Sequence, residues 1–319
     1  MLSSLIPHFL QVTEEAAIAC SVLIGKGDRK GADKLATEAM RASLNGMPLS
    51  VRVVIGEGER DKAPMLFIGE ELGTGGSEVD IAVDPLEGTN LAATDAPNAI
   101  TVMAIGPRGT LLHAPDTYMD RIVVGPKVKE ILDLDAPVRD NLEKVARGYN
   151  IPLSEVVVMV LDRPRNFDLI QGIRQAGAKI RLIGDGDIIA CVMSMMAEEM
   201  GVHASFGIGA APEATISACL TKACGGQFHG RLKPYDTDMK ILQEDVVKRL
   251  SEMGITDLEH VYTEQDLVQG EDLLFVATGV TRGDVLKGVV RSAGVIETES
   301  LVVFSKLKTW QKIMTKRLM

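Results

Sequence analysis

The hydrophobic pattern of the first third of the chain changes between helical spacing and short apolar runs. Apolar residues recur three and four positions apart at 13–23 and 29–44, which predicts helices there. Short apolar runs predict strands at 51–55, 79–83, 99–105, 110–113 and 121–124. The segment Gly106-Pro107-Arg108-Gly109 lies between two of these runs and predicts a hairpin. Because short turns join successive strands, we expect an antiparallel or mixed sheet in this part of the chain.

A different pattern begins near residue 156. Runs that predict strands lie at 156–161, 179–183, 202–206 and 273–278, and most of them alternate with helical stretches. This alternation is typical of a mostly parallel sheet with helices on both faces. We therefore predict an α/β protein whose domains meet in the polar segment 141–152. The predicted units are an N-terminal α+β domain at 1–150 and a C-terminal α/β domain at 151–299. The tail at 300–319 begins with a predicted strand at 300–305, is basic after it, and is expected to join the N-terminal domain.

Composition restricts the partners and the compartment. The formal net charge is -10, which argues against nucleic acid or an anionic membrane as the main partner. Four scattered cysteines without a C-x-x-C pair indicate a reducing compartment. The first ten residues lack the features of a signal peptide, and no apolar run approaches the roughly 20 residues that cross a bilayer. We expect a soluble cytoplasmic protein.

Several predicted strands end in acidic turns that contain glycine. GEGER follows 51–55, DPLEGT follows 79–83 and GDGD follows 179–183. One such turn is commonly a helix cap. Ligands of open α/β sheets, however, gather at the carboxyl ends of strands, and carboxylate oxygens are the ligands that Mg²⁺ and Mn²⁺ prefer. Because acidic turns recur at several strand ends, a metal site is favoured over helix capping.

The turn DPLEGT at 84–89 is the most informative of these. Asp84 leaves the strand, Pro85 fixes the backbone, and Gly88 lets the chain turn closely around a bound group. Asp84 and Glu87 can then converge on one cation. Thr89 begins the following helix, where backbone N–H groups attract phosphate. The motif therefore predicts a site for a metal ion and a phosphate group.

The motif D-P-[LI]-[ED]-G-[TS] is the hallmark of the lithium-sensitive phosphatase superfamily. The rest of the chain resembles one branch, the class II (GlpX-type) fructose-1,6-bisphosphatases, and its matching segments run in family order. They are VTEEAAIA (12–19), GKGDRKGADKLATEAMR (25–41), VIGEGERDKAPML (54–66), VDIAVDPLEGT (79–89), APDTYMD (114–120), GDGD (184–187), GIGAAPE (207–213) and ATGVTRGDVLKGV (277–289). The resemblance implies a layered α-β-α-β-α sugar-phosphatase sandwich, a role in gluconeogenesis, and a homodimer or homotetramer.

The resemblance also implies a role for individual residues. Two or more divalent ions, Mn²⁺ or Mg²⁺, are expected, with Asp33 and Glu57 on one ion and Asp84, Glu87 and Glu213 on a second. Thr89 is implied to contact the phosphate and to help activate the attacking water, with Glu59 and Asp61 as catalytic helpers. The residues implied to hold the sugar bisphosphate are Glu87, Gly88, Thr89, Tyr118, Arg163, Pro164, Arg165, Asp185, Gly186, Asp187 and Ala210.

Elementary chemistry agrees with these roles. Two metal ions about 3.5–4 Å apart polarise phosphoryl oxygens and lower the pKa of a bound water. Arg163 and Arg165 are suited to a bidentate grip on the distal phosphate, and Asp187 to accepting sugar hydroxyls. The chain departs from the family at three positions, with Arg29 and Arg163 in place of lysine and Ala210 in place of glycine. Arginine is not an equivalent point charge, and Ala210 adds a methyl group to the expected sugar pocket.

Other functions remain alternatives at this point. Within the family, the substrate could be sedoheptulose 1,7-bisphosphate, alone or beside fructose 1,6-bisphosphate, whereas an inositol monophosphatase fits the surrounding motifs less well. GDGDII at 184–189 is similar to the D-x-D nucleophile of haloacid-dehalogenase-type phosphatases, but that interpretation leaves DPLEGT and Glu213 without a role. A P-loop kinase is disfavoured because G-x-x-x-x-G-K-[ST] is missing. A catalytically silent sugar-phosphate sensor is the alternative from another functional class.

Overall fold

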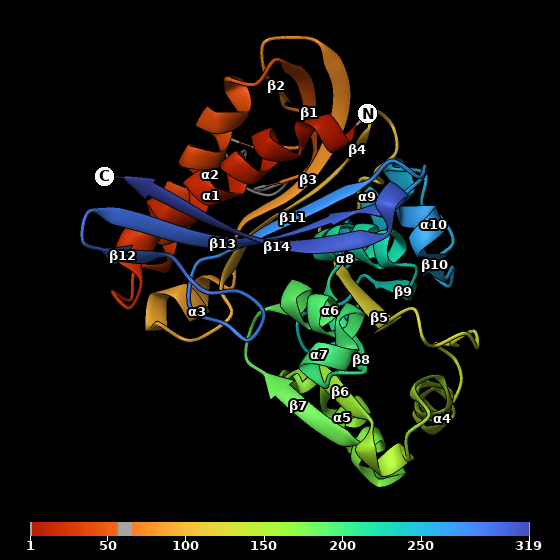
Figure 1. Cartoon of the computed structure of the whole chain (residues 1–319). Coiled ribbons are helices and arrows are strands. Elements are labelled where there is room, and N and C mark those ends of the chain that lie inside the picture. Colours follow the sequence, from red (N-terminus) through yellow and green to blue (C-terminus); the bar gives the residue numbers. More distant parts are fainter. Residues whose placement is uncertain (1, 57–65, 319) are drawn as a thin grey trace. The chain divides into compact units, whose positions relative to one another are not determined.

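The computed structural model describes residues 2–56 and 66–318. The chain divides into two compact units, unit 1 at 1–113 and 268–319 and unit 2 at 114–267. Figure 1 shows the elements of both units along the chain. Within the described residues no helix combines the length and the apolar character needed to cross a membrane.

Unit 1 contains a mixed sheet. Its described strands follow the order β12-β13-β11-β4-β3-β1-β2, and β14 pairs with β13. β1 and β3 are parallel, whereas the other neighbours are antiparallel. The strands are β1 (Leu49–Ile55), β2 (Glu71–Leu72), β3 (Ser77–Glu87), β4 (Ile100–Pro107), β11 (Leu274–Gly279), β12 (Val290–Ser292), β13 (Val295–Phe304) and β14 (Thr309–Leu318). This confirms the mixed α/β class and the mixed N-terminal sheet.

Two long helices cover the sheet of unit 1. α1 (Ile6–Cys20) packs on β11, β4 and β13, and α2 (Arg29–Asn45) packs on α1 and β3 (Figure 1). α2 begins where Asp28 accepts a hydrogen bond from Gly31 N, a side-chain cap of the helix. Buried aliphatic and methionine side chains from both helices and the sheet form one core. The short α3 (Thr89–Thr94) follows β3 directly.

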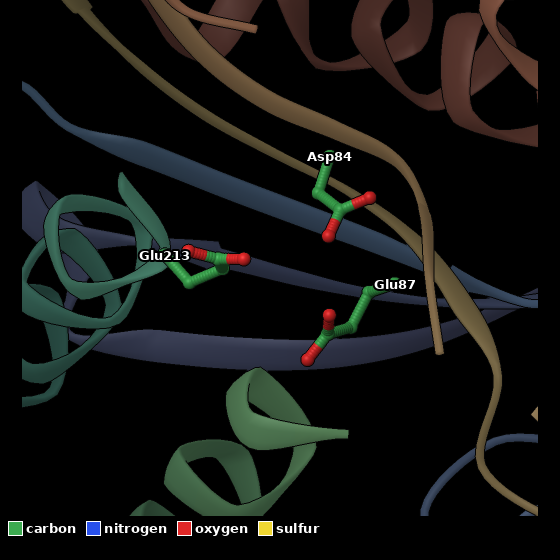
Figure 2. A group of neighbouring side chains, drawn as sticks. All are labelled: Asp84, Glu87 and Glu213. Carbon is green, nitrogen blue, oxygen red and sulfur yellow. The ribbon is translucent and has the colours of Figure 1, made fainter. Parts of the chain in front are cut away.

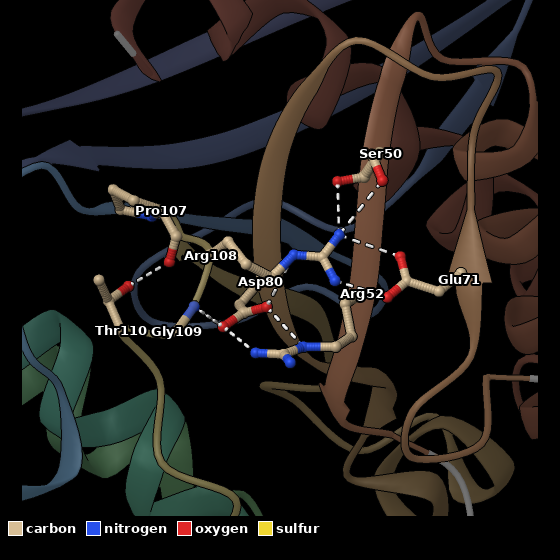
Figure 3. A network of polar contacts seen from close by, with 8 residues as sticks. All are labelled: Ser50, Arg52, Glu71, Asp80, Pro107, Arg108, Gly109 and Thr110. Carbon is tan, nitrogen blue, oxygen red and sulfur yellow. Dashed lines mark hydrogen bonds and ion pairs between the residues drawn. The ribbon is translucent and has the colours of Figure 1, made fainter.

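A network of ion pairs joins β1, β2, β3 and the end of β4 (Figure 3). Asp80 on β3 is fully buried, and Arg52 on β1 binds it bidentately at 2.8 and 2.9 Å. Gly109 N donates to the same carboxylate at 2.5 Å. Arg108 reaches Glu71 on β2 at 2.5 and 3.0 Å and Ser50 Oγ at 3.2 Å. The buried charge of Asp80 is therefore satisfied in full, and the network fixes the neighbouring strands in register.

Unit 2 is built on a second sheet with helices on both faces. Its described strands follow the order β10-β9-β5-β8-β6-β7. α4 and α5 pack on one face through a core that includes Leu142, Val145 and Ile173, and α6 and α8 contact β5 and β8. The elements are β5 (Tyr118–Val124), α4 (Val138–Tyr149), β6 (Val157–Leu161), α5 (Phe167–Ala176), β7 (Lys179–Ile183), α6 (Asp187–Met195), α7 (Ala197–Met200), β8 (Ala204–Ala210), α8 (Ala211–Cys224), β9 (Gln227–Lys233), α9 (Glu244–Glu252), β10 (Tyr262–Thr263) and α10 (Glu264–Leu267).

The structure corrects several expectations about strand pairing. The second sheet is not mostly parallel, because only β6 pairs in parallel, with β7 and β8, while β5, β8, β9 and β10 pair antiparallel. Residues 110–113 form no strand and make one isolated bridge, Leu111 with Val268, so the predicted hairpin is wrong. β4 instead pairs with β3 and β11. The strand predicted at 300–305 is the end of β13, and the basic segment after it contains a further strand, β14.

The compact units also differ from the predicted domains 1–150 and 151–299. Chain crossings fall at 113/114 and 267/268, so β5 and α4 belong to unit 2. The run at 273–278, which we assigned to the C-terminal sheet, is β11 of unit 1. The polar segment 141–152 that suggested the boundary contains most of α4 and its end at Asn150. Its polarity reflects the solvent side of an amphipathic helix and not a linker.

Candidate metal and substrate site

The carboxylates of Asp84 and Glu87 lie together at the end of β3. In a regular strand, residues three apart point to opposite faces. Here the register against β4 shifts by one residue, since Asp84 pairs with Val102 and Glu87 pairs with Ile100. The bulge therefore turns both acidic side chains to one face, where carboxylate oxygens of the two lie within 4.8 Å (Figure 2). Leu86 N donates to Asp84 Oδ1 at 3.0 Å, which holds the turn.

The residues after Glu87 form the turn and the helix start at which the sequence predicts a phosphate group. Gly88 has the left-handed conformation (φ 84°), and a Cβ there would lie 2.8 Å from Leu91 Cδ1. Thr89 then starts α3, a helix of six residues. Arg29, one of the departures from the family, donates to Asn90 Oδ1 at 2.7 Å. Arg29 thus contacts the neighbour of Thr89, which is consistent with a role for its charge at this turn.

The other metal ligands predicted for unit 1 lie apart from this pair or cannot be described. Asp33 is on α2, and burial raises the pKa of its carboxyl group. Among the described residues it does not join Asp84 and Glu87 in a group of carboxylates within 4.8 Å. Glu57, Glu59 and Asp61 lie outside the described residues, just beyond the end of β1.

Unit 2 supplies Glu213, the remaining predicted metal ligand. It lies in the first turn of α8, which begins at Ala211 directly after β8. A carboxylate at this position interacts favourably with the positive end of the helix dipole. The side chain of Glu213 is half-buried, and Figure 2 draws it with Asp84 and Glu87.

Three of the predicted substrate residues meet on the sheet of unit 2. Tyr118 and Ala210 are directly paired across β5 and β8. The guanidinium carbon of Arg165 lies 4.6 Å from the centre of the Tyr118 ring, and Arg165 Nε donates to Ile208 O at 2.9 Å. Burial lowers the pKa of Arg165, and the nearby charge of Arg163 adds to this effect. The cation–π contact fixes the Arg165 side chain beside Tyr118.

Arg163 and Pro164 line a cavity of about 660 Å³ in unit 2. Phe167 of α5 and Lys240 also line it, and so do three acidic residues, Asp162, Asp168 and Asp238. Arg163 Nη1 donates to Asp162 O at 3.1 Å. The two arginines predicted to bind the distal phosphate have different neighbours, since Arg165 contacts Tyr118 while Arg163 lines the cavity.

The GDGD turn lies between β7 and α6. Gly186 has φ 91° and precedes Asp187, the first residue of α6. The Asp187 carboxylate forms an ion pair with Arg121, which is buried on β5. Sequence reasoning missed Arg121. The available signal was an arginine beside the apolar run Ile122-Val123-Val124, where a charged residue is unexpected.

Comparison with known proteins identifies the family of the chain. Residues 3–317 match the model of a family described as "Bacterial fructose-1,6-bisphosphatase, glpX-encoded". The chain belongs to this family. The chain is similar to a D-fructose 1,6-bisphosphatase class 2/sedoheptulose 1,7-bisphosphatase of Synechococcus sp. (strain JA-3-3Ab), with 44% identity over 95% of this chain and 92% of the relative. Fructose-1,6-bisphosphatase 1 class 2 of Escherichia coli (strain K12) is 40% identical over 96% of this chain and 93% of the relative.

Similarity to solved structures is much weaker. The inositol monophosphatase of Anabaena (Nostoc) sp. PCC 7120 superposes with a TM-score of 0.33 at 14% identity, over 60% of this chain and 71% of that chain. Membership in the fructose-1,6-bisphosphatase family therefore rests on sequence.

Proposed function

We propose that the protein hydrolyses the 1-phosphate of fructose 1,6-bisphosphate and releases fructose 6-phosphate and inorganic phosphate. The observation that carries this proposal is the family match over residues 3–317, with named relatives 40–44% identical over nearly their whole length. The reaction belongs to carbohydrate metabolism, in gluconeogenesis. We place it in the cytoplasm and expect a homodimer or homotetramer.

We infer that Asp84 and Glu87 hold a divalent cation, Mn²⁺ or Mg²⁺. Their carboxylates share one face of β3 within 4.8 Å, and a cation between them offsets their repulsion. Glu213 is proposed as a further ligand, and Asp33 and Glu57 as ligands of a second ion. Such ions, when bound, polarise the phosphoryl oxygens and lower the pKa of a bound water.

The residues after the proposed metal ligands are proposed to orient the phosphoryl group and the attacking water. The left-handed Gly88 brings the backbone close to the site, and the Thr89 hydroxyl orients the attacking water. Glu59 or Asp61 accepts the proton from that water. Each of these groups acts by position and charge, which is the main contribution of a protein to phosphoryl transfer.

Unit 2 is proposed to bind the sugar and its distal phosphate. Arg165, which lies against Tyr118, and Arg163 provide the positive charge. The turn Asp185-Gly186-Asp187 accepts hydrogen bonds from the sugar hydroxyls. Pro164 and Ala210 complete the surface, with Ala210 placed beside Tyr118 by the pairing of β5 and β8.

Sedoheptulose 1,7-bisphosphate is the second candidate substrate. The relatives from Synechococcus, at 43–44% identity, are named for both bisphosphatase activities, whereas the relative from Escherichia coli at 40% is named for the fructose substrate. The difference in identity is small, so both substrates belong in the first assay.

The test is the release of phosphate by the purified protein from each bisphosphate. We expect release with Mn²⁺ or Mg²⁺, none with EDTA, and very little from a Thr89→Ala variant, while Thr89→Ser keeps part of the rate. No release above background with either metal and either substrate would overturn the enzyme proposal in favour of the silent sensor. Full activity of Thr89→Ala would remove Thr89 from the mechanism.

A further inference from the structure

We propose that Arg121 is a positioning residue that fixes the starts of α6 and α8 for binding of the sugar bisphosphate. This inference rests on the proposed function, because Asp187 and Ala210 are the substrate residues that Arg121 contacts. Arg121 lies on β5, three residues after Tyr118.

The contacts of Arg121 reach two helix starts at once. One terminal nitrogen, Nη2, forms the ion pair with Asp187 Oδ2 at the first residue of α6. The other, Nη1, donates to Ala210 O at 3.3 Å, and this carbonyl precedes the first residue of α8. The guanidinium group therefore joins the GDGD turn to the turn that carries Glu213. A rigid planar fork is suited to such a double contact, and the ammonium group of lysine is not.

The surroundings leave the pair little freedom. The side chain of Arg121 is 3% exposed and that of Asp187 is 15% exposed. Gly209 packs directly on them, since a Cβ at this position would lie 1.9 Å from Asp187 Oδ2 and 2.5 Å from Arg121 Nη2. The glycine has no positive φ that demands it, so the close approach of the ion pair explains why this position of β8 has no side chain.

A gain in stability is not enough to explain the buried ion pair of Arg121 and Asp187. Well-packed apolar residues often stabilise a fold as well or better, because both charges lose their hydration. Arg121 also limits the conformations of Asp187, whose carboxylate is proposed to accept sugar hydroxyls. Fixing a binding group in advance lowers the entropic cost of binding the ligand. The pair is thus suited to pre-organising the substrate side of unit 2.

The kinetic test compares Arg121→Met, Arg121→Lys and a matched control, Arg147→Met. Arg147 forms an ion pair as well, with Glu130, but this pair is on the surface and the Arg147 side chain is 55% exposed. We expect Arg121→Met to raise KM for fructose 1,6-bisphosphate about tenfold or more with a smaller change in kcat, because uniform substrate binding is lost. Arg121→Lys recovers part of the loss, and Arg147→Met stays within twofold of wild type.

A double mutant separates positioning from a general structural role. In an Asp187→Asn background, the effect of Arg121→Met on KM shrinks, because the group that Arg121 orients is already changed. A merely structural role would instead lower the melting temperature and kcat, leave KM unchanged, and show the same loss in both backgrounds. That pattern would overturn the proposal.

Gly209→Ala keeps the test decisive if Arg121→Met does not fold. The added methyl group displaces the ion pair while both charges remain, so KM rises as for Arg121→Met. Gly46→Ala is the control, since its Cβ would meet only Ser43 O at 3.6 Å and Ala42 O at 4.0 Å. An unchanged KM in a folded Gly209→Ala variant would contradict the proposal.

Hydrogen exchange tests the positioning without turnover. Ala190 N donates to Gly186 O at the start of α6, and we expect its amide to exchange faster in Arg121→Met or Gly209→Ala than in wild type. Equal exchange would count against Arg121. Inactive wild-type protein with this exchange pattern would instead contradict the proposed function and leave the positioning intact.

Discussion

β3 carries two acidic sites with opposite designs, four residues apart. Asp80 is fully buried and accepts hydrogen bonds from Nε and Nη2 of Arg52 and from the N–H of Gly109 (Figure 3). The protein itself therefore compensates the charge of Asp80. At the other end of the strand, a bulge brings a second carboxylate, Glu87, to within 4.8 Å of Asp84. At the first site an arginine and a backbone N–H surround one carboxylate, and at the second site two carboxylates lie together.

The difference shows how structural and functional carboxylates can be told apart. An ion pair supplied by the fold makes a carboxylate part of the scaffold. Two carboxylates brought within 4.8 Å of each other on one face provide oxygen ligands for a single cation. The second arrangement persists in proteins because it serves a ligand, and here it coincides with the DPLEGT motif. The comparison predicts that substitutions at the two sites will separate activity from stability.

The largest effect is expected for Glu87→Gln and Asp84→Asn. Removing a proposed metal ligand should lower kcat/KM by on the order of 10²–10³, as for loss of other groups that stabilise the transition state. The melting temperature of the metal-free protein should stay equal or rise, because the repulsion is relieved. Glu78→Gln, an exposed position on the same strand, is the control for loss of one charge. A full rate for both variants would contradict the metal assignment.

An intermediate effect, of the opposite kind, is expected for Asp80→Asn. It leaves Arg52 without its carboxylate and should lower the free energy of unfolding by about 3 kcal/mol, at the low end for a buried pair because Arg52 is 37% exposed. The kcat of the folded fraction should stay within about twofold of wild type. Urea unfolding and initial rates on the same samples measure both quantities. Loss of rate without loss of stability would break the comparison.

The smallest effect is expected for Glu71→Gln, at the edge of the Asp80 network. The hydrogen bond from Arg108 lowers the pKa of Glu71 below its ordinary value of 4.5. A depressed carboxyl pKa contributes stability above the unfolded-state value, and this contribution is lost as the pH falls through the folded-state value. Because Glu71 is 53% exposed, its contribution at pH 7 is under about 1 kcal/mol. Wild type and variant should converge on acidification below pH 4.5, and a constant difference would contradict the assignment.

Local sequence patterns predicted the elements of the fold better than their pairing. The runs at 51–55 and 179–183 lie within β1 and β7, because β-branched runs bounded by glycine have few other solutions. The crossing near residue 113 was missed because the segment 108–117 between β4 and β5 contains both apolar and polar residues, like the segments around it. β14 was missed because an edge strand needs only one buried face, and lysines interrupt its apolar residues.

The site residues show the same contrast between local patterns, which were predicted, and pairing, which was not. Asp84, Glu87 and Thr89 were found from one motif, because the residues that we propose for the chemistry are close together in sequence there. The bulge that turns Asp84 and Glu87 to one face depends on the pairing of β3 with β4, which the motif does not encode. Arg121 was missed because its partners Asp187 and Ala210 are 66 and 89 residues away in sequence, and their meeting depends on the order of strands in the second sheet.

Anomalous diffraction from crystals grown with Mn²⁺ tests the central claim most directly. The account predicts a manganese peak at the β3 bulge, about 2.0–2.2 Å from oxygens of both Asp84 and Glu87. The peak should vanish in crystals of Glu87→Gln grown in the same way and persist in those of Asp80→Asn. Manganese bound elsewhere, with no density between the carboxylates of Asp84 and Glu87, would contradict it.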